Sequence, residues 1–128
     1  MTDSSAPEAL LRAVPFADEL GIALEEAAPA WAPVLCTAGG VLHGGALMTL
    51  ADTAGAVCAF LNLPPVASTS TVESKTNFFR AVRSGTVHAE ARPVHVGRSF
   101  IAVRTDLHDE DGTLVGQTAQ TQAVLTDG

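Results

Sequence analysis

The segment from Leu42 to Asp52 contains the residues whose types and spacing best suit chemistry. His43, Gly44 and Gly45 open an apolar helical stretch, and one carboxylate, Asp52, follows nine residues after the histidine. The start of a helix offers unpaired backbone N–H groups and partial positive charge, which can polarise a carbonyl group. A carboxylate in apolar surroundings costs several kcal/mol unless it is paired or used. The two features supply an electrophile-polarising site and a base or nucleophile, the two halves of acyl-transfer chemistry.

A helix predicted over residues 45–61 must position Asp52. It ends before Pro64, because the residue that precedes a proline is disfavoured in a helix. One wide face is apolar and carries Leu47, Leu50, Ala51, Ala54, Val57 and Leu61. The opposite face carries Met48, Asp52, Gly55, Ala56 and Ala59. A sheet covers one side of such a helix, so we expect the small-residue face to pack against a second copy of the chain. A salt bridge across that interface is the structural alternative for Asp52.

Period-two alternation in the later segments predicts a half-exposed antiparallel sheet. Turn residues separate these segments and suggest a four-stranded meander of residues 69–79, 86–94, 99–107 and 114–125. Two short strands, residues 22–27 and 31–36, are expected before the long helix, and a capping box at residues 5–8 predicts a short helix before them. We find no internal repeat or linker, and therefore expect a single domain over residues 1–128.

The charge distribution limits the partners of the chain. A net charge of −7 makes the protein a poor partner for nucleic acid. Six of the seven basic residues lie between Lys75 and Arg104, where Glu90 is the one acidic residue, so this window carries +5 and the remainder −12. A local basic zone in an acidic protein suggests a small anionic ligand. A solvated face of the sheet is the alternative with equal weight.

The cysteines and the N-terminus predict a cytoplasmic location. Cys36 and Cys58 are expected to be reduced thiols, because the N-terminus lacks the basic and apolar regions of a signal peptide. The apolar stretch of residues 41–63 contains Asp52 and Asn62. A central Asp alone costs roughly 2.5–3.5 kcal/mol on membrane insertion. We therefore expect a buried helix and no membrane partner.

The chain resembles the hotdog-fold acyl-CoA thioesterases, in particular the phenylacetate-pathway (PaaI-like) branch. That branch carries a loop glycine, a His-Gly-Gly sequence, a small-residue helix and an Asp nine residues after the His. Gly40, His43-Gly44-Gly45 and Asp52 match this pattern. Residues 71–80 are similar to the central strand of the family, residues 97–99 to the turn that follows it, and residues 15–22 to its N-terminal part. The ordered set covers nearly the whole chain.

The resemblance implies an α+β hotdog fold, in which one long central helix is wrapped by an antiparallel sheet of about five or six strands, with a short N-terminal helix. It also implies an enzyme that hydrolyses an acyl-CoA to a free acid and coenzyme A. Such an enzyme needs no cofactor, because coenzyme A is part of the substrate. Self-association as a homodimer or homotetramer is expected.

The resemblance also implies the catalytic roles. Gly44 would donate its backbone N–H to the thioester oxygen, and Asp52 of the other subunit would act as general base or nucleophile. Thr71 would help to orient the attacking water. His43 would bind the substrate carbonyl or hold the loop. The chain departs from the family at Thr37, where Asn or Gln is usual, although the threonine hydroxyl can still donate one hydrogen bond.

The same resemblance suggests that the basic zone binds the phosphates of coenzyme A. Coenzyme A carries a 3′-phosphate and a pyrophosphate. Arg80, Arg83 and Arg98 lie at predicted turns or strand ends, from which they could reach phosphates. Ser99 and Gly45 are further candidates for substrate binding. For each arginine, a solvated charge is the alternative.

The helix geometry requires two subunits. Asp52 lies roughly 12 Å beyond Gly44 at 1.5 Å per residue, which is too far for both to touch one carbonyl group. Two other functions stay open: a non-catalytic acyl-CoA binding or sensor protein, and a hotdog hydratase or dehydratase, whose Asp-x-Asn-Pro-x-His pattern is missing from the sequence. We predict no metal site, because no carboxylate or cysteine lies at metal-ligand spacing from His88, His95 or His108.

Overall fold

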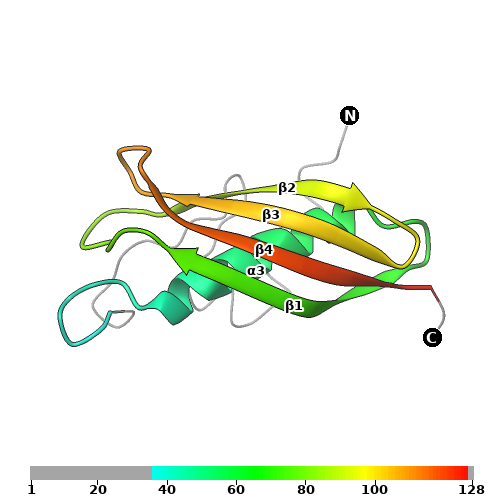
Figure 1. Ribbon diagram of the computed structural model, residues 1–128, viewed down its shortest axis with the longest axis horizontal. Coiled ribbons are helices and arrows are strands. Elements are labelled where there is room, and N and C mark those ends of the chain that lie inside the picture. The colour runs from blue at the N-terminus through cyan, green and yellow to red at the C-terminus, as the bar shows by residue number, and fades with distance from the viewer. Residues whose placement is uncertain (1–35, 127–128) are drawn as a thin grey trace.

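The structure is a computed structural model that describes residues 36–126, which form one helix and four strands (Figure 1). The helix α3 (Gly44–Leu61) is followed by the strands β1 (Ser68–Phe78), β2 (His88–Val96), β3 (Phe100–His108) and β4 (Leu114–Leu125). The short N-terminal helix and the two strands expected before α3 lie outside the described residues, apart from Cys36, which forms an isolated bridge with Leu42. The described sheet thus has four strands, where the whole fold is expected to have about five or six.

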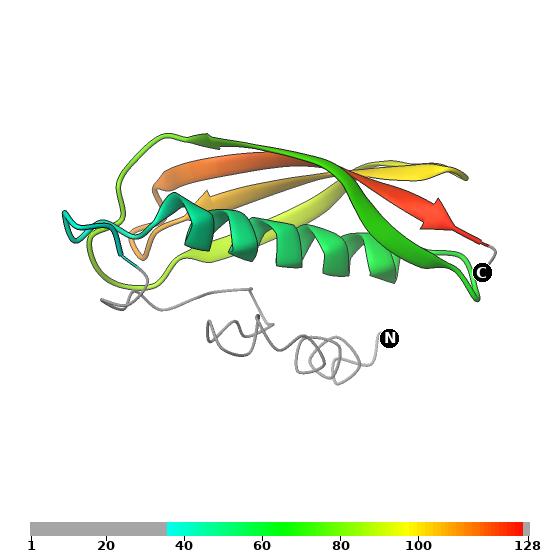
Figure 2. The ribbon, with the colours of Figure 1, turned by 90° about the horizontal axis from the view of Figure 1, so that it is seen from below.

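Helix α3 begins one residue earlier than predicted and ends where predicted. Its N-cap is His43, in an extended conformation, and its C-cap is Asn62, just before the proline pair. The helix lies across one face of the sheet (Figure 2). Its buried residues include most of the predicted apolar face and belong to the core: Leu47, Leu50, Ala51, Ala54, Gly55, Val57 and Ala59.

The predicted division of the helix into a sheet face and a small-residue face is wrong in part. Gly55 and Ala59 are buried, whereas Leu61 is 52% exposed. The side chain of Gln120 occupies the space beside Gly55, and Ala59 belongs to a buried cluster with residues of β3. A twisted sheet curves round the helix and covers more than one side of it (Figure 2). The small residues therefore let the sheet approach the helix closely.

The strand order is β1-β4-β3-β2, with every neighbouring pair antiparallel. The predicted meander is correct for β2, β3 and β4 but wrong for β1, which pairs with β4 instead of β2. Hairpin loops are short, whereas residues 79–87 form a longer connection that crosses the end of the sheet from one edge to the other (Figure 1). The pairing places β1 beside the last strand of the chain, at an open edge of the described sheet.

A β-bulge interrupts the pairing of β1 with β4. Thr71 pairs with Gln122, but the register shifts between Thr71 and Glu73, so that Val72 is left without a partner. Bulges redirect side chains and are common beside functional sites. The bulge leaves Thr71 on the face that looks toward α3, where it meets Asp52.

The face of the sheet beneath α3 buries mainly apolar side chains on one half and mainly polar ones on the other, with Thr105 and Val115 as exceptions. The half formed by β2 and β3 buries apolar side chains, among them Ala89, Ile101, Val103 and Leu107. The half formed by β4 and β1 buries hydrogen-bonded polar side chains, among them Thr118, Gln120 and Gln122. The apolar half supplies the hydrophobic stabilisation of the helix.

By length and composition, α3 is the one helix among the described residues that could cross a membrane. In this fold its apolar residues pack on the sheet and form the core cluster with Val82, Val87, Leu107 and Val115. The burial identifies α3 as the core helix of the domain.

Leu107→Ala tests the apolar half of the interface. Leu107 is fully buried in the main core cluster, so its truncation is expected to lower the free energy of unfolding by about 2–5 kcal/mol. Urea denaturation measures the loss. Leu114→Ala is the matched control, because Leu114 is 36% exposed at the start of β4, and its loss is expected to be the smaller. Equal losses at the two positions would contradict this packing.

Candidate functional site

His43 caps the N-terminus of α3 with its own side chain. Its Nδ1 atom accepts a hydrogen bond from the backbone N–H of Gly45 at 2.8 Å. Its carbonyl oxygen accepts from the N–H groups of Ala46 at 2.9 Å and Leu47 at 3.3 Å. An imidazole that accepts at Nδ1 carries its proton on Nε2 when it is neutral, so the exposed edge of the ring is a donor.

The N–H of Gly44 is the open donor of this helix terminus. Among the described residues it has no hydrogen-bond partner, while the N–H of Gly45 is already bonded to His43. The Phe78 ring lies against Gly44: a Cβ atom there would stand 3.2 Å from the Phe78 Cζ atom. The partial positive charge of the helix terminus adds to the donor strength of Gly44.

A cavity of about 370 Å³ opens beside Gly44. Thr37 and Arg80, two of the residues predicted for the site, line it together with Gly44. The half-exposed rings of Phe78 and Phe79 form an apolar part of its wall. The cavity therefore combines one open backbone donor, one cation and apolar surface, a combination that suits a ligand with a polar and an apolar part.

We call the Gly44 N–H and its cavity the first half-site. Asp52 lies in a second half-site, which it forms with residues of β1 and β4. Its Oδ1 atom accepts a hydrogen bond from Thr71 Oγ1 at 3.1 Å and one from Gln120 Nε2 at 3.2 Å. The side chain is exposed on one side. Within the described residues of one chain it makes no ion pair, and a salt bridge across a subunit interface stays a prediction.

Two glutamines were missed by the sequence reading. Gln120 and Gln122 are almost fully buried, and Gln122 Oε1 accepts from both Gln120 Nε2 at 2.8 Å and Thr71 Oγ1 at 2.6 Å. Gln122 Nε2 in turn donates to Thr69 Oγ1 at 3.1 Å. The available signal was the pair of amides at alternate positions of the last strand, which places both on one face.

One chain does not bring the two half-sites together. Asp52 is the eighth residue after Gly44 in one continuous helix, which corresponds to about 12 Å along the axis. Thr37 and Arg80 lie with Gly44, whereas Thr71 lies with Asp52. A reacting group that needs both halves must receive one of them from elsewhere.

The arginines proposed for phosphate binding lie at turns, as predicted, but at opposite ends of the sheet. Arg80 and Arg83 belong to the connection between β1 and β2, near the N-terminus of α3. Arg98 and Ser99 belong to the turn between β2 and β3, at the other end (Figure 1). None of the three arginines forms an ion pair with another described residue. Within one chain they do not form a single cluster.

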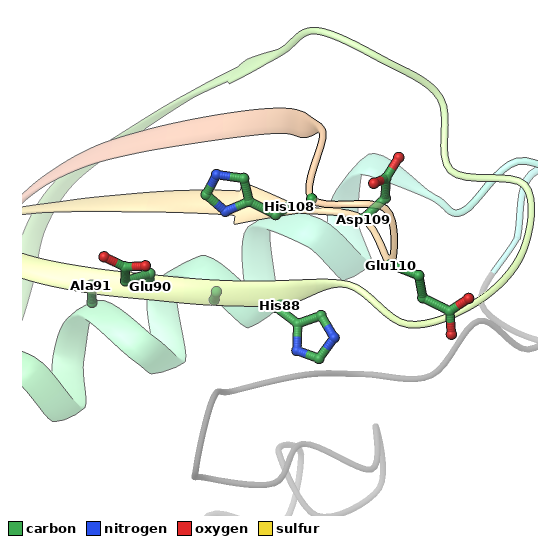
Figure 3. A pocket seen from close by; sticks show the side chains of 8 residues that line it. His88, Glu90, Ala91, His108, Asp109 and Glu110 are labelled. Atoms are coloured by element: carbon green, nitrogen blue, oxygen red, sulfur yellow. The ribbon is translucent and has the colours of Figure 1, made fainter.

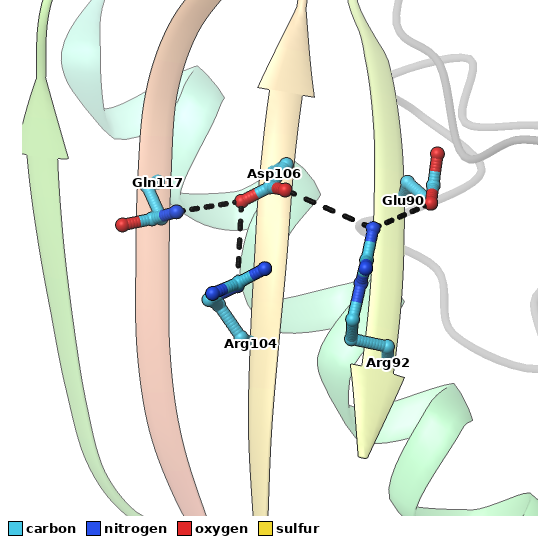
Figure 4. Close-up of polar contacts among 5 residues, drawn as sticks. All are labelled: Glu90, Arg92, Arg104, Asp106 and Gln117. Carbon is cyan, nitrogen blue, oxygen red and sulfur yellow. Dashed lines mark hydrogen bonds and ion pairs between the residues drawn. The ribbon is translucent and has the colours of Figure 1, made fainter. Parts of the chain in front are cut away.

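Two other cations of the basic window are neutralised on the outer face of the sheet, away from α3 (Figure 4). Arg92 lies 2.8 Å from Glu90 and 4.0 Å from Asp106, and Arg104 lies 3.8 Å from Asp106. Gln117 Nε2 also donates to Asp106 at 2.8 Å. For Arg92 and Arg104, the alternative of a solvated face of the sheet is confirmed, because both side chains are about half exposed there.

A further cavity of about 450 Å³ lies at the β2 edge, where His88 and Glu90 line it with residues of the β3–β4 turn. The labelled imidazole and carboxylate groups, which include His108 and Glu110, point in different directions (Figure 3). Within residues 36–126, no group of three or more His, Cys, Asp or Glu side chains is arranged to hold a metal ion. The cavity is separate from both half-sites.

Cys58 is a thiol near the C-terminal end of α3, packed beside the cluster of Ala59, Ile101 and Val103. Burial raises the pKa of the Cys58 thiol, because it disfavours the thiolate. A thiol with a raised pKa is a poor nucleophile at neutral pH. Cys58 therefore has the properties of a core residue.

Substitution of His43 tests its role as the cap of α3. His43→Ala removes the acceptor for the Gly45 N–H and is expected to lower the free energy of unfolding by about 1 kcal/mol. His43→Asn keeps a side-chain acceptor at the N-cap and is expected to retain most of the stability. Chemical denaturation measures both. An Asn variant as unstable as the Ala variant would contradict the capping role.

Comparison with known proteins gives a consistent family. A family model described as the thioesterase superfamily matches residues 39–116. The 1,4-dihydroxy-2-naphthoyl-CoA hydrolase of Escherichia coli K12 is 31% identical over 86 residues, which cover 67% of this chain and 63% of that protein. The chain spans less than two thirds of the length of several curated relatives, for example 57% of one from Vibrio cholerae.

Solved structures show the same fold. A thioesterase from Haemophilus influenzae superposes with a TM-score of 0.87 at 27% identity, over 98% of this chain and 93% of that one. A Bacillus halodurans protein solved with CoA superposes with a TM-score of 0.82 at 25% identity, over 86% of this chain and 75% of that one. A phenylacetic acid degradation-related protein from Ralstonia eutropha gives 0.79 at 25% identity, over 91% and 98%. These matches confirm the hotdog fold and the predicted resemblance, and the family match over more than half of the sequence shows that the chain belongs to the thioesterase superfamily.

Proposed function

We propose that this protein is an acyl-CoA thioesterase, which hydrolyses a thioester to a free acid and coenzyme A. The observation that carries the proposal is the open N–H of Gly44 at the N-terminus of α3, beside a cavity. When a nucleophile attacks a thioester carbonyl, negative charge develops on its oxygen. One backbone donor aimed at that charge is typically worth about 2.7–4 kcal/mol. The relative named as a CoA-ester hydrolase supports the substrate class.

Asp52 of the partner subunit supplies the other half of the reaction. It either takes a proton from the attacking water or attacks the acyl carbon itself, to form an anhydride that water then cleaves. In both routes the C–S bond breaks, the sulfur leaves as the thiol of coenzyme A, and water provides the second oxygen of the acid. Thr71 lies beside Asp52, 3.1 Å from its Oδ1 atom, and in this proposal it helps to orient that water.

The open edge of β1 is the surface that joins the two subunits in this proposal. An unpaired edge strand is a template for another strand, and a twofold axis between two copies pairs such edges antiparallel. Both α3 helices would then run in opposite directions. The Asp52 carboxylate of one copy would be brought toward the Gly44 N–H of the other, the separation that a single helix cannot close. Val72, 68% exposed at the bulge, is an apolar contact available at this edge.

Coenzyme A recognition is assigned to Arg80, Arg83 and Arg98, which carry no ion pair with described residues. Arg80 is the one arginine among the described residues that line the Gly44 cavity, beside the proposed reaction centre. Guanidinium groups bind phosphate oxygens through two parallel hydrogen bonds. The Bacillus halodurans relative solved with CoA supports this ligand.

Loss of either half of the site is expected to abolish turnover. Asp52→Asn removes the base or nucleophile, and Gly44→Pro removes the backbone N–H at a helix position that tolerates proline. Each is expected to lower kcat/KM at least about 100-fold in a thiol-release assay on a panel of acyl-CoAs. Unchanged release by Asp52→Asn would refute the mechanism.

Gly44→Ala is the control for Gly44→Pro. It keeps the N–H and adds a methyl group that would stand 3.2 Å from the half-exposed Phe78 ring, which can shift slightly. Substantial activity is therefore expected in this variant. Binding of acyl-CoA without release of thiol by the wild type would favour the non-catalytic sensor, and addition of water to an enoyl-CoA would favour the hydratase.

Mixed subunits test whether the site is shared between chains. Asp52→Asn and Gly44→Pro are each expected to be inactive alone. A dimer that contains one chain of each kind has one intact site, so a random mixture is expected to recover about a quarter of the wild-type sites. Thiol release after mixing and re-equilibration of the subunits measures the recovery. A mixture as inactive as its components, with exchange verified by native mass spectrometry, would place both groups in one chain.

A further inference from the structure

We propose that Gln120 is a positioning residue that holds the Asp52 carboxylate in its reactive orientation, and that Gly55 provides the room for Gln120 to do so. The proposal rests on the proposed function, which gives Asp52 its chemical role. It assigns a task to two residues that the His-Gly-Gly and Asp pattern does not include.

Four polar atoms form a closed ring beneath α3. Gln120 Nε2 donates to Asp52 Oδ1 at 3.2 Å and to Gln122 Oε1 at 2.8 Å. Thr71 Oγ1 lies 3.1 Å from the same Asp52 oxygen and 2.6 Å from the same Gln122 oxygen. The carboxylate is thus bonded to β4 through Gln120 and to β1 through Thr71, and Gln122 of β4 closes the ring between them.

The number of available protons makes Gln120 the constant donor of this ring. A threonine hydroxyl has one proton, so Thr71 can donate to Asp52 or to Gln122 but not to both at once. The NH₂ group of Gln120 has two protons and serves both acceptors together. An ionised carboxylate only accepts, which also fixes the orientation of the Gln120 amide with nitrogen toward Asp52. Loss of Gln120 therefore removes the donor that can bond to Asp52 whether or not the Thr71 proton points to Gln122.

The burial of Gln120 is costly for a residue with a purely structural role. Its side chain is 2% exposed, and its Oε1 atom has no hydrogen-bond partner among the described residues. A buried polar atom without a partner destabilises the fold, and an apolar side chain of the same shape would avoid the cost. The presence of an amide at this position is explained if its nitrogen is needed at Asp52.

Gly55 is the helix position that admits the amide. A Cβ atom at Gly55 would overlap Oε1 of Gln120 and would stand 3.0 Å from its Nε2. Gly55 lies three residues after Asp52, on the same side of α3. Any larger residue would push the amide away from the carboxylate that it binds.

The arrangement leaves the second carboxylate oxygen available. Both hydrogen bonds to Asp52 end on Oδ1, and Oδ2 has no hydrogen-bond partner within the described residues. With Oδ1 tied to the sheet, rotation of the carboxylate is restricted and Oδ2 is presented outward. A base or nucleophile that is held in its reactive orientation reacts faster than one that rotates freely.

Gln120→Met tests the proposal, because methionine keeps the length of the side chain and lacks the donor. The expected result is a fall in kcat of about 10- to 100-fold, the range for a hydrogen bond to a charged group, with KM within about twofold of wild type. The melting temperature is expected to change little, since the variant removes the unpartnered Oε1 atom but leaves either Asp52 Oδ1 or Gln122 Oε1 without a donor. A purely structural residue would give the opposite pair of results.

Gln117→Met is the matched control. Gln117 lies on the same strand but donates to Asp106 on the outer face (Figure 4), so its loss is expected to leave kcat and KM unchanged. Gly55→Ala is expected to reduce kcat as Gln120→Met does. In a Gln120→Ala background, where the amide no longer fills the space, Gly55→Ala is expected to cost no further activity.

The outcomes separate this inference from the proposed function. A wild-type kcat in Gln120→Met, or a loss that only follows a loss of folded protein, overturns the positioning role while Asp52→Asn stays inactive. A further loss from Gly55→Ala in the Gln120→Ala background overturns the role given to Gly55. Equal turnover by wild type and Asp52→Asn overturns the proposed function itself.

Discussion

A carboxylate in the middle of an apolar core helix is the constraint on which much of this structure depends. Asp52 is exposed on one side and receives two hydrogen bonds from the sheet on which the helix lies, one from Thr71 and one from Gln120. The sheet therefore turns polar side chains inward along β4, where Gln120 and Gln122 are buried. The helix must lack a side chain at Gly55 for Gln120 to reach it. The contacts of this one carboxylate thus connect residues of two elements far apart in the sequence.

In the proposed function, the two halves of the sheet have different roles, one in stability and one in chemistry. The half formed by β2 and β3 buries Ile101, Val103 and Leu107 and holds α3 through hydrophobic contact. The half formed by β4 and β1 holds a hydrogen-bonded polar network around the Asp52 carboxylate. In the proposed function this network orients the carboxylate. Because the same helix lies on both, firm packing on the apolar side supplies the rigidity with which the polar side can fix a carboxylate.

Local features of the fold were predictable from the sequence, and long-range ones were not. The ends of α3 and the four strands follow from periodicity, capping and proline positions, which are properties of neighbouring residues. The pairing of β1 with β4 could not be derived, because alternation shows which residues share a face but not which strands are neighbours. The helix pattern likewise could not show that the sheet curves round to bury Gly55 and Ala59. Gln120 was missed because its contact with Asp52 depends on that same strand order and register.

The separation of the two half-sites follows from the geometry of the helix and no side-chain motion removes it. Gly44 and Asp52 belong to one uninterrupted helix, whose rise per residue keeps them about 12 Å apart. The strand that holds Thr71 against Asp52 is also the open edge of the described sheet. If two copies pair through that edge, the strand that completes the dimer is the one that orients the carboxylate. Dimer assembly and formation of the active site would then be one event. An isolated chain would contain both half-sites, but they would be too far apart to act on one substrate.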